Sequence, residues 1–181
     1  MKILAVQASP RHNGNTALLL EHYLKGVREK YPQAEIQTVY LHGKNIEPCR
    51  GCNRCKEERC GCVIRDDMQD LYQKFHRAEV LIFATPVYWW NITSQLKRFM
   101  DRMYAIDVES GFKNKKFVLL LTYGGALPNS GPELVQRTFK EICDYVHMDF
   151  VQFYGTCTDD YKPVEENQEA QEAVYEMGKA L

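Results

Sequence analysis

The sequence lacks both a long hydrophobic run and a surplus of charge of either sign. Its longest apolar stretches are about five residues, whereas a membrane-spanning helix needs roughly 20. Lys and Arg number 23 and Asp and Glu number 24, so there is no basic excess to attract nucleic acids or anionic membranes. The apolar N-terminal stretch is too short for a signal peptide. We therefore expect a cytoplasmic protein with no nucleic-acid partner and no membrane partner.

The composition and the order of apolar segments predict one domain over residues 1–181. Hydrophobic residues make up 45% of the chain and aromatic residues 12%, which is typical of a packed globular domain. Apolar runs typical of strands alternate with segments whose apolar residues recur at helical spacing. The expected strands are 2–8, 35–41, 79–84, 116–122 and 149–154; the expected helices are 15–30, one from about 67, 92–106, and two more with stripes at 135–146 and 170–177.

Strict alternation of strands and helices indicates an α/β fold, in which helices cover both faces of a parallel sheet. The first, third and fourth strands are nearly continuous apolar runs, as central strands are, whereas polar residues interrupt the second and fifth. This pattern predicts a three-layer, flavodoxin-like, doubly wound sheet of five parallel strands in the order 2-1-3-4-5. In that order a ligand binds where strands 1 and 3 diverge. The loops after strands 1, 3 and 4 are therefore expected to form the site.

Four motifs that would give such a sheet another function are missing. The loop after strand 1 has neither the G-x-G-x-x-G dinucleotide fingerprint nor the Gly-Lys-Ser/Thr ending of a nucleotide-triphosphatase loop. A phosphoacceptor receiver needs acidic residues after strands 1 and 3, where this chain has Ala8-Ser9 and Thr85-Pro86. A small phosphatase needs an arginine six positions after a cysteine, and no cysteine here has one. These four classes are excluded.

The loop after the first strand carries the groups of an anion site. The helix that follows it begins with backbone N–H groups that have no partner within the helix. Thr16 can donate a hydroxyl hydrogen bond to a phosphate oxygen, and Gly14 allows a close approach of the backbone. The alternative is an ordinary turn in which Asn13 or Asn15 is only the helix N-cap. On the first interpretation the phosphate-binding residues are Ser9, Arg11, Asn13, Asn15 and Thr16.

The loops after the third and fourth strands would suit a flat, amphipathic ligand. Three consecutive aromatic residues offer apolar faces, and two glycines let the backbone lie close to a planar ring. The alternatives are that the aromatic residues cover the end of the sheet or form a dimer contact, and that the glycines form a plain turn. The candidate residues are Pro86, Val87, Tyr88, Trp89, Trp90 and Asn91 in one loop, and Thr122, Tyr123, Gly124 and Gly125 in the other.

Five of the seven cysteines lie in a loop expected at about 44–65. Cys49-x2-Cys52-x2-Cys55, followed by Cys60 or Cys62, resembles the ligand spacing of a [4Fe–4S] cluster. A zinc site usually pairs two separated C-x2-C motifs and fits less well, and free thiols are a third alternative. Neighbouring basic residues are expected to lower the thiol pKa values; these residues are Arg50, Arg54, Lys56 and Arg59.

Three separate motifs, in the same order, resemble the NADPH-dependent FMN reductases and in particular their iron–sulfur flavoprotein branch. The resemblance covers the chain from residue 1 to about 125. It departs from the family at Trp89-Trp90-Asn91, where smaller residues are common. The motifs are SPR and GNT within 9–16, the cysteine run with VIRDDM at 63–68, and PVY, QLKRF and DR within 86–102.

The resemblance implies a flavodoxin-like fold, bound FMN, and dimers or tetramers with the flavin near a subunit interface. It implies that Ser9, Arg11, Asn15 and Thr16 bind the FMN phosphate, and that residues 86–91 and 122–125 surround the isoalloxazine ring. It also favours Cys62 over Cys60 as the fourth cluster ligand.

Together these features predict an FMN-dependent oxidoreductase. It would take a hydride from NADH or NADPH onto bound FMN and pass electrons to free flavin, a quinone or another small-molecule acceptor. The cofactor supplies the chemistry, so no catalytic side chain is predicted. The alternative is an electron-transfer protein, a homodimer or homotetramer fed by ferredoxin through a [4Fe–4S] cluster on Cys49, Cys52, Cys55 and Cys62. A third hypothesis is a non-enzymatic zinc-binding module, for which the loop at 9–16 would be coincidence.

Overall fold

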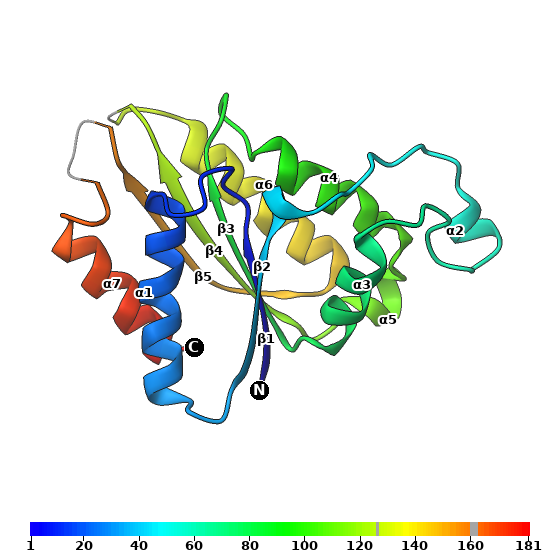
Figure 1. Cartoon of the computed structure of the whole chain (residues 1–181), viewed down its shortest axis with the longest axis horizontal. Coiled ribbons are helices and arrows are strands. Elements are labelled where there is room, and N and C mark those ends of the chain that lie inside the picture. The colour runs from blue at the N-terminus through cyan, green and yellow to red at the C-terminus, as the bar shows by residue number, and fades with distance from the viewer. Residues whose placement is uncertain (126, 160–162) are drawn as a thin grey trace.

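A computed structural model, which describes residues 1–125, 127–159 and 163–181, contains one parallel sheet of five strands (Figure 1). The strand order is β2-β1-β3-β4-β5, which confirms the order expected from the sequence. β1 pairs with β2 on one side and with β3 on the other. The order in which successive strands are added to the sheet therefore reverses at β1. The strands are β1 Lys2–Gln7, β2 Glu35–Tyr40, β3 Val80–Pro86, β4 Lys116–Tyr123 and β5 Asp149–Cys157.

Helices cover both faces of this sheet (Figure 1). α1 and α7 lie against one face, and α3, α4 and α6 lie against the other. The helices are α1 Asn15–Lys30, α2 Arg54–Glu57, α3 Met68–Arg77, α4 Ser94–Arg102, α5 Val108–Gly111, α6 Gly131–Val146 and α7 Gln168–Lys179. Within the described ranges, no helix is long and apolar enough to cross a bilayer.

Alternate residues of the central strands point to opposite faces of the sheet, and this divides the core into two clusters. Leu4 and Phe83 face α3, α4 and α6, whereas Ile3 and Ile82 face α1 and α7. Successive strand residues point to opposite faces, so a strand covered on both sides must be apolar at every position. This is why β1, β3 and β4 appear in the sequence as continuous apolar runs. The edge strand β2 is buried mainly at Val39.

The helix expected over 92–106 is shorter than its apolar stripe. α4 begins after Thr93, whose hydroxyl caps it by accepting a hydrogen bond from the backbone N–H of Leu96 at 3.3 Å. Its end tightens into a 3₁₀ turn over Met103–Ala105, and Ile106 is extended. Ile106 remains 2% exposed, so the periodicity identified buried positions correctly but placed both helix ends wrongly.

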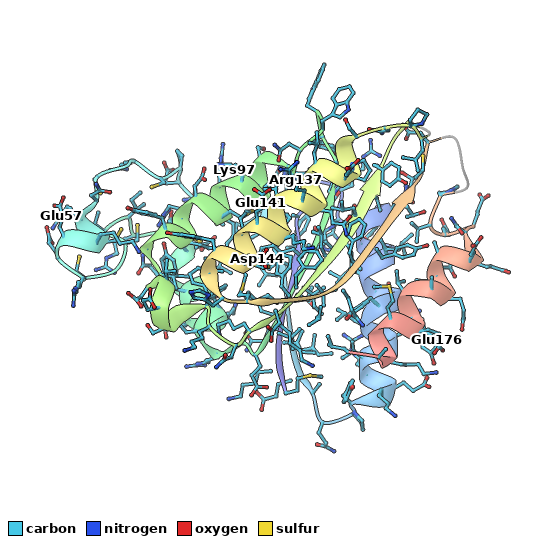
Figure 2. The ribbon with its side chains drawn as sticks, turned by 180° about the vertical axis from the view of Figure 1, so that it is seen from behind. Glu57, Lys97, Arg137, Glu141, Asp144 and Glu176 are labelled. Carbon is cyan, nitrogen blue, oxygen red and sulfur yellow. The ribbon has the colours of Figure 1, made fainter. Side chains whose placement is uncertain are left out.

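The segment between β2 and α3 contains five of the seven cysteines and carries little regular structure. It holds one 3₁₀ turn, Leu41–Gly43, and the short helix α2. α2 lies far from α7, as the labelled Glu57 and Glu176 show (Figure 2). Both ends of the segment are tied together, because Asp67 accepts a hydrogen bond from the backbone N–H of Asn45 at 2.8 Å. The cysteines therefore occupy a closed loop outside the layered core.

We expect the contact between α1 and α7 to be intolerant of any side chain at its glycines. A Cβ atom on Gly26 would lie 1.9 Å from the carbonyl oxygen of Tyr175. Gly26→Ala should therefore lower the free energy of unfolding by about 1–3 kcal/mol or more, as overpacking does. Urea titration would measure the loss. Gly43→Ala is the matched control, because its nearest neighbour is a Tyr40 side-chain atom at 3.4 Å; equal losses in the two variants would contradict the prediction.

Candidate functional site

The loops after β1, β3 and β4 meet in one cleft of about 320 Å³ at the carboxyl edge of the sheet. This is the edge at which a site was expected. The hydroxyl of Thr93 donates a hydrogen bond to the carbonyl oxygen of Ala8 at 2.8 Å, which ties the loop after β3 to the end of β1. The cleft is lined by Ser9, Arg11, Asn15, Thr16, Pro86, Val87, Tyr88, Trp89, Trp90, Thr122, Tyr123, Gly124, Asn129, Thr158 and Asp159.

The loop after β1 is folded by its own polar groups. The Ser9 hydroxyl oxygen accepts a hydrogen bond from the backbone N–H of Arg11 at 3.1 Å, and the Tyr40 hydroxyl donates to the carbonyl oxygen of Pro10 at 2.7 Å. α1 begins after Gly14, which provides no side-chain cap. Neither Asn13 nor Asn15 is the N-cap. The amino end of a 16-residue helix is therefore left to interact with an anion.

Asn15 and Thr16 occupy the first turn of α1 and connect it to other elements. The side-chain oxygen of Asn15 accepts a hydrogen bond from the backbone N–H of Val164 at 3.0 Å. The Thr16 and Thr122 hydroxyl oxygens lie 2.7 Å apart, and both side chains are buried. The Asn15 amide nitrogen and the helix N–H groups are hydrogen-bond donors, as phosphate recognition requires.

The loop after β3 forms a tight turn that presents aromatic side chains. The backbone groups of Tyr88 and Asn91 hydrogen-bond each other at 2.8 and 3.0 Å. Between them Trp89 and Trp90 have φ values of 49° and 59°, a left-handed conformation that is uncommon for bulky residues. Trp89 is 92% exposed, and the turn projects beyond the neighbouring loops (Figure 1). The aromatic residues line the cleft but also extend outward from it.

Sequence reasoning missed the fourth wall of the cleft, which is formed by residues that follow β5 and by Asn129, which precedes α6. Asn129 donates a hydrogen bond from its side-chain nitrogen to the carbonyl oxygen of Gly124 at 3.0 Å. Asp159 packs so closely on Gly124 that a Cβ atom there would lie 1.9 Å from its carboxylate oxygen. Thr158 and Asp159 directly follow β5, the neighbour of β4. Parallel strands end at one edge, so this adjacency was the signal that could have found them.

Three predicted residues lie outside the cleft lining. Asn13 is exposed, with its side-chain oxygen 2.7 Å from the Nδ1 atom of His12. The side-chain oxygen of Asn91 accepts a hydrogen bond from the backbone N–H of Ile92 at 2.8 Å. Gly125 has a φ of 76°, and its carbonyl oxygen accepts a hydrogen bond from the Cys157 thiol at 3.5 Å.

Four of the clustered cysteines line one small cavity of about 30 Å³. They are Cys49, Cys52, Cys55 and Cys62. Cys60 does not line it; its thiol donates to the carbonyl oxygen of Gly61 at 3.4 Å. In the part of the chain that the structure describes, no three His, Cys, Asp or Glu side chains are gathered closely enough to hold a metal ion. The four thiols share a cavity, but they would have to draw together to bind a cluster.

The basic residues of the loop do not have the expected effect on the Cys55 thiol. Burial raises the pKa of Cys55 and outweighs the opposite effect of Lys56. The Lys56 ammonium donates to the carbonyl oxygen of Ile106 at 3.0 Å, and Arg54 pairs with Glu58 at 2.8 Å. The expectation of a lowered thiol pKa is thus wrong for Cys55, because burial raises that pKa by more than Lys56 lowers it.

A buried ion pair closes the cysteine loop against α4. Arg102, at the end of α4, is 1% exposed and pairs with Asp66 at 2.5 Å. Burial opposes the charge of Asp66, but hydrogen bonds from Arg102 and from the backbone N–H groups of Glu47 and Met68 outweigh it and lower its pKa. Burial likewise opposes the charge of Arg102, and the hydrogen bonds to Asp66 more than compensate and raise its pKa. Both groups are therefore ionised at neutral pH.

A larger apolar groove of about 750 Å³ lies between α4 and α6. Its lining includes Met100 on α4 and Ile142 on α6, and Tyr104 and Tyr145 at its rim are exposed. Cys49 lines both the apolar groove and the cysteine cavity. Exposed apolar surface of this extent commonly marks an interaction site.

The sheet order, and the cleft at the carboxyl edge beside the amino end of α1, define a protein with a flavodoxin-like fold. The model of the NADPH-dependent FMN reductase family matches residues 1–157. The chain belongs to that family. The expectation of an FMN-dependent oxidoreductase that uses NAD(P)H is thereby confirmed as a family assignment.

Similar proteins include archaeal iron–sulfur flavoproteins. One from Methanocaldococcus jannaschii is 36% identical over 133 residues, which are 74% of this chain and 66% of that protein. One from Methanosarcina thermophila is 30% identical over 187 aligned positions, covering 100% of this chain and 93% of that protein. The chain thus spans slightly less than two thirds of the first relative.

Solved structures share the fold at low sequence identity. An FMN-dependent NADH-azoreductase from Bacillus anthracis, solved with FMN, superposes with a TM-score of 0.77 at 17% identity over 99% of both chains. This likeness shows the same flavodoxin-like architecture.

We expect the Asp66–Arg102 pair to contribute stability that is lost in acid. A carboxylate whose pKa is lowered by folding stabilises the protein above its usual value, here 3.8, and loses that contribution as pH falls through the folded value. Asp66→Asn should cost about 3–5 kcal/mol near pH 7, because it leaves a buried guanidinium unpaired. It should also flatten the dependence of stability on pH below about 4.

Urea unfolding at a series of pH values would measure both effects. Asp70→Asn is the matched control, because the Asp70 side chain is 59% exposed and pairs with Lys74 on the surface of α3. A cost no larger for Asp66→Asn than for Asp70→Asn would disprove the role of the buried pair.

Proposed function

We propose that the protein is an oxidoreductase whose cleft at the carboxyl edge holds FMN, receives a hydride from NADH or NADPH and passes electrons to a small acceptor. The acceptor class is free flavin, a quinone or a similar small molecule. The observation that carries the proposal is the meeting of the loops after β1, β3 and β4 around the uncapped end of α1. Membership of the FMN reductase family supports it.

The cleft supplies hydrogen-bond donors for a phosphate and flat aromatic side chains for a ring system, as FMN requires. Arg11, Asn15, Thr16 and the helix N–H groups suit the phosphate, because an anion is stabilised by cationic and N–H donors. Tyr88 and Trp90 line the wall that suits the ring system. On the opposite wall, Gly124 leaves room for the Asp159 carboxylate, which fills the space that a Cβ atom would need.

The residues of the cleft bind and orient rather than transfer protons. Bound FMN supplies the redox chemistry itself, and the protein supplies position and electrostatics. The Thr16 hydroxyl is fixed against Thr122 and the Asn15 side chain against the backbone of Val164. We therefore assign no catalytic acid or base.

Removing phosphate donors should weaken FMN binding. Each hydrogen bond to a charged group is worth about 1.5–3 kcal/mol, so Thr16→Ala and Asn15→Ala should each raise the FMN dissociation constant about 10- to 100-fold. Titration of the FMN-free protein with FMN, followed by flavin fluorescence, would measure the dissociation constant. Thr138→Ala is the matched control, because Thr138 lies on α6 with its hydroxyl bonded to the carbonyl oxygen of Leu134. Unchanged affinity in both test variants would refute the phosphate site.

A second candidate function is electron transfer through a [4Fe–4S] cluster, fed by a ferredoxin-like donor. Its specific support is the cavity lined by Cys49, Cys52, Cys55 and Cys62. The all-thiol donor set suits iron–sulfur chemistry, and relatives bear the name iron–sulfur flavoprotein. In this role we infer a homodimer or homotetramer, with a second copy covering the apolar groove that Cys49 also lines.

Anaerobic purification followed by absorption spectroscopy and iron, sulfide and zinc analysis would separate the candidates. With a cluster, Cys62→Ser should lose most of the iron while Cys60→Ser, the matched control, retains it. A flavin spectrum without iron would leave the FMN reductase as the function. Zinc at one equivalent would favour a structural metal, and bleaching of the flavin by NADPH or by reduced ferredoxin would identify the donor.

A further inference from the structure

Arg102 is anchored almost entirely to the two ends of the cysteine loop. One terminal guanidinium nitrogen donates to the carbonyl oxygen of Glu47 at 2.9 Å and to the Asp66 carboxylate at 2.5 Å. The other donates to the carbonyl oxygen of Ile64 at 3.3 Å and to the second Asp66 oxygen at 3.1 Å. Glu47 precedes the first cysteine of the loop and Ile64 follows the last. Arg102 thus holds the loop ends together from α4.

One donor of this guanidinium has no acceptor. A guanidinium carries five N–H donors, and four of them are used in the bonds to Glu47, Ile64 and Asp66. The fifth, on Nε, is buried and has no hydrogen-bond partner among the described residues. Such a group is uncommon in a folded protein, because its interaction with water is lost without replacement. The structure therefore holds an unused donor at this point.

The Cys62 side chain is the group that this donor can serve. Cys62 interacts electrostatically with the Arg102 guanidinium and with the Tyr72 hydroxyl. Cys62 and Arg102 also line the same cavity as the other three thiols. Tyr72 donates its hydroxyl hydrogen to the carbonyl oxygen of Arg102 at 2.8 Å, which fixes the backbone from which the guanidinium extends.

Cys60 has no comparable surroundings. It is exposed, and its sulfur lies 3.7 Å from a carboxylate oxygen of Glu58 and 3.9 Å from the carbonyl oxygen of Arg54. These are acceptors, and they suit a protonated thiol. A metal-bound thiolate instead needs a donor, because its sulfur carries negative charge. The two cysteines thus differ in the polarity of the groups that they meet.

We propose that Arg102 is a positioning residue for the cysteine site, donating its Nε hydrogen to the Cys62 sulfur when that sulfur is a cluster ligand. The inference rests on the cluster of the second candidate function. The hydrogen bond orients Cys62 and gives it preference over Cys60. It also withdraws electron density from the sulfur, which stabilises the reduced cluster and raises its reduction potential. Asp66 neutralises the guanidinium, so the effect comes from the directed N–H bond rather than from net charge.

Pulsed electron paramagnetic resonance of the reduced, wild-type holoprotein would test this contact directly. In protein labelled with nitrogen-15 arginine, we expect a hyperfine coupling between one arginine nitrogen and the cluster. Arg102→Lys keeps the charge opposite Asp66 but has no Nε–H, so it should abolish the coupling. Arg137→Lys is the matched control, because Arg137 lies on the outer face of α6 beside Glu141 (Figure 2), and the coupling should persist there.

A redox titration of the same proteins gives an independent readout. Arg102→Lys should disfavour cluster reduction about tenfold, a shift of about 59 mV to more negative potential for one electron, with the FMN content unchanged. No coupling in the wild type would overturn the inference while leaving the cluster in place, even if Arg102→Lys failed to fold. An unchanged reduction potential in an Arg102→Lys variant that folds and contains the cluster would also overturn the inference. Wild-type protein without iron would overturn the cluster proposal and this inference together.

Discussion

The functional geometry depends on the parallel pairing of the five strands. Parallel neighbours cannot be joined by a tight turn, so every connection runs from the carboxyl edge of the sheet through a helix back to the amino edge, and all five strands end at the same edge. The loops after β1, β3 and β4 are therefore brought side by side, whatever their sequences. Short bonds then fix their relative positions: Thr93 to the carbonyl oxygen of Ala8 at 2.8 Å, and the backbone N–H of Val87 to the carbonyl oxygen of Thr122 at 2.8 Å. The cleft is therefore held together by bonds at the strand ends and in the loops that directly follow them.

The sequence was sufficient for the sheet order because burial determines which residues a strand can carry. A central strand covered on both faces must be apolar throughout, and edge strands tolerate polar residues. The same reasoning located the cleft. It does not indicate whether an individual asparagine lines the cleft, because residue type does not tell where a side chain in a tight loop will point. Asn91 bonds the backbone of Ile92, and Asn13 lies beside His12 on the surface. Asp159 was missed because only three of the five strand ends were considered.

The cysteine loop shows a different limit. Spacing identified a set of thiols but could not choose between Cys60 and Cys62, two residues apart. In the structure Cys62 lines the small cavity together with Cys49, Cys52 and Cys55, and Cys60 does not. Local charge was also misleading for Cys55, because burial raises the pKa of its thiol by more than Lys56 lowers it; the Lys56 ammonium is bonded to the carbonyl oxygen of Ile106, and Arg54 pairs with Glu58. Electrostatic effects in a loop depend on where each long side chain ends, which the sequence does not state.

α4 connects the two regions and also keeps them apart. Its amino end, at Thr93, is bonded to the strand that enters the cleft, and its carboxyl end, at Arg102, closes the cysteine loop. The nine residues of α4 span roughly 14 Å at 1.5 Å per residue. The cleft and the cysteine cavity share no lining residue. The helix thus places Thr93, beside the cleft, and Arg102, at the cysteine loop, at its two ends. Because the two sites have no lining residue in common among the described residues, we expect the binding of one group to survive changes that remove the other.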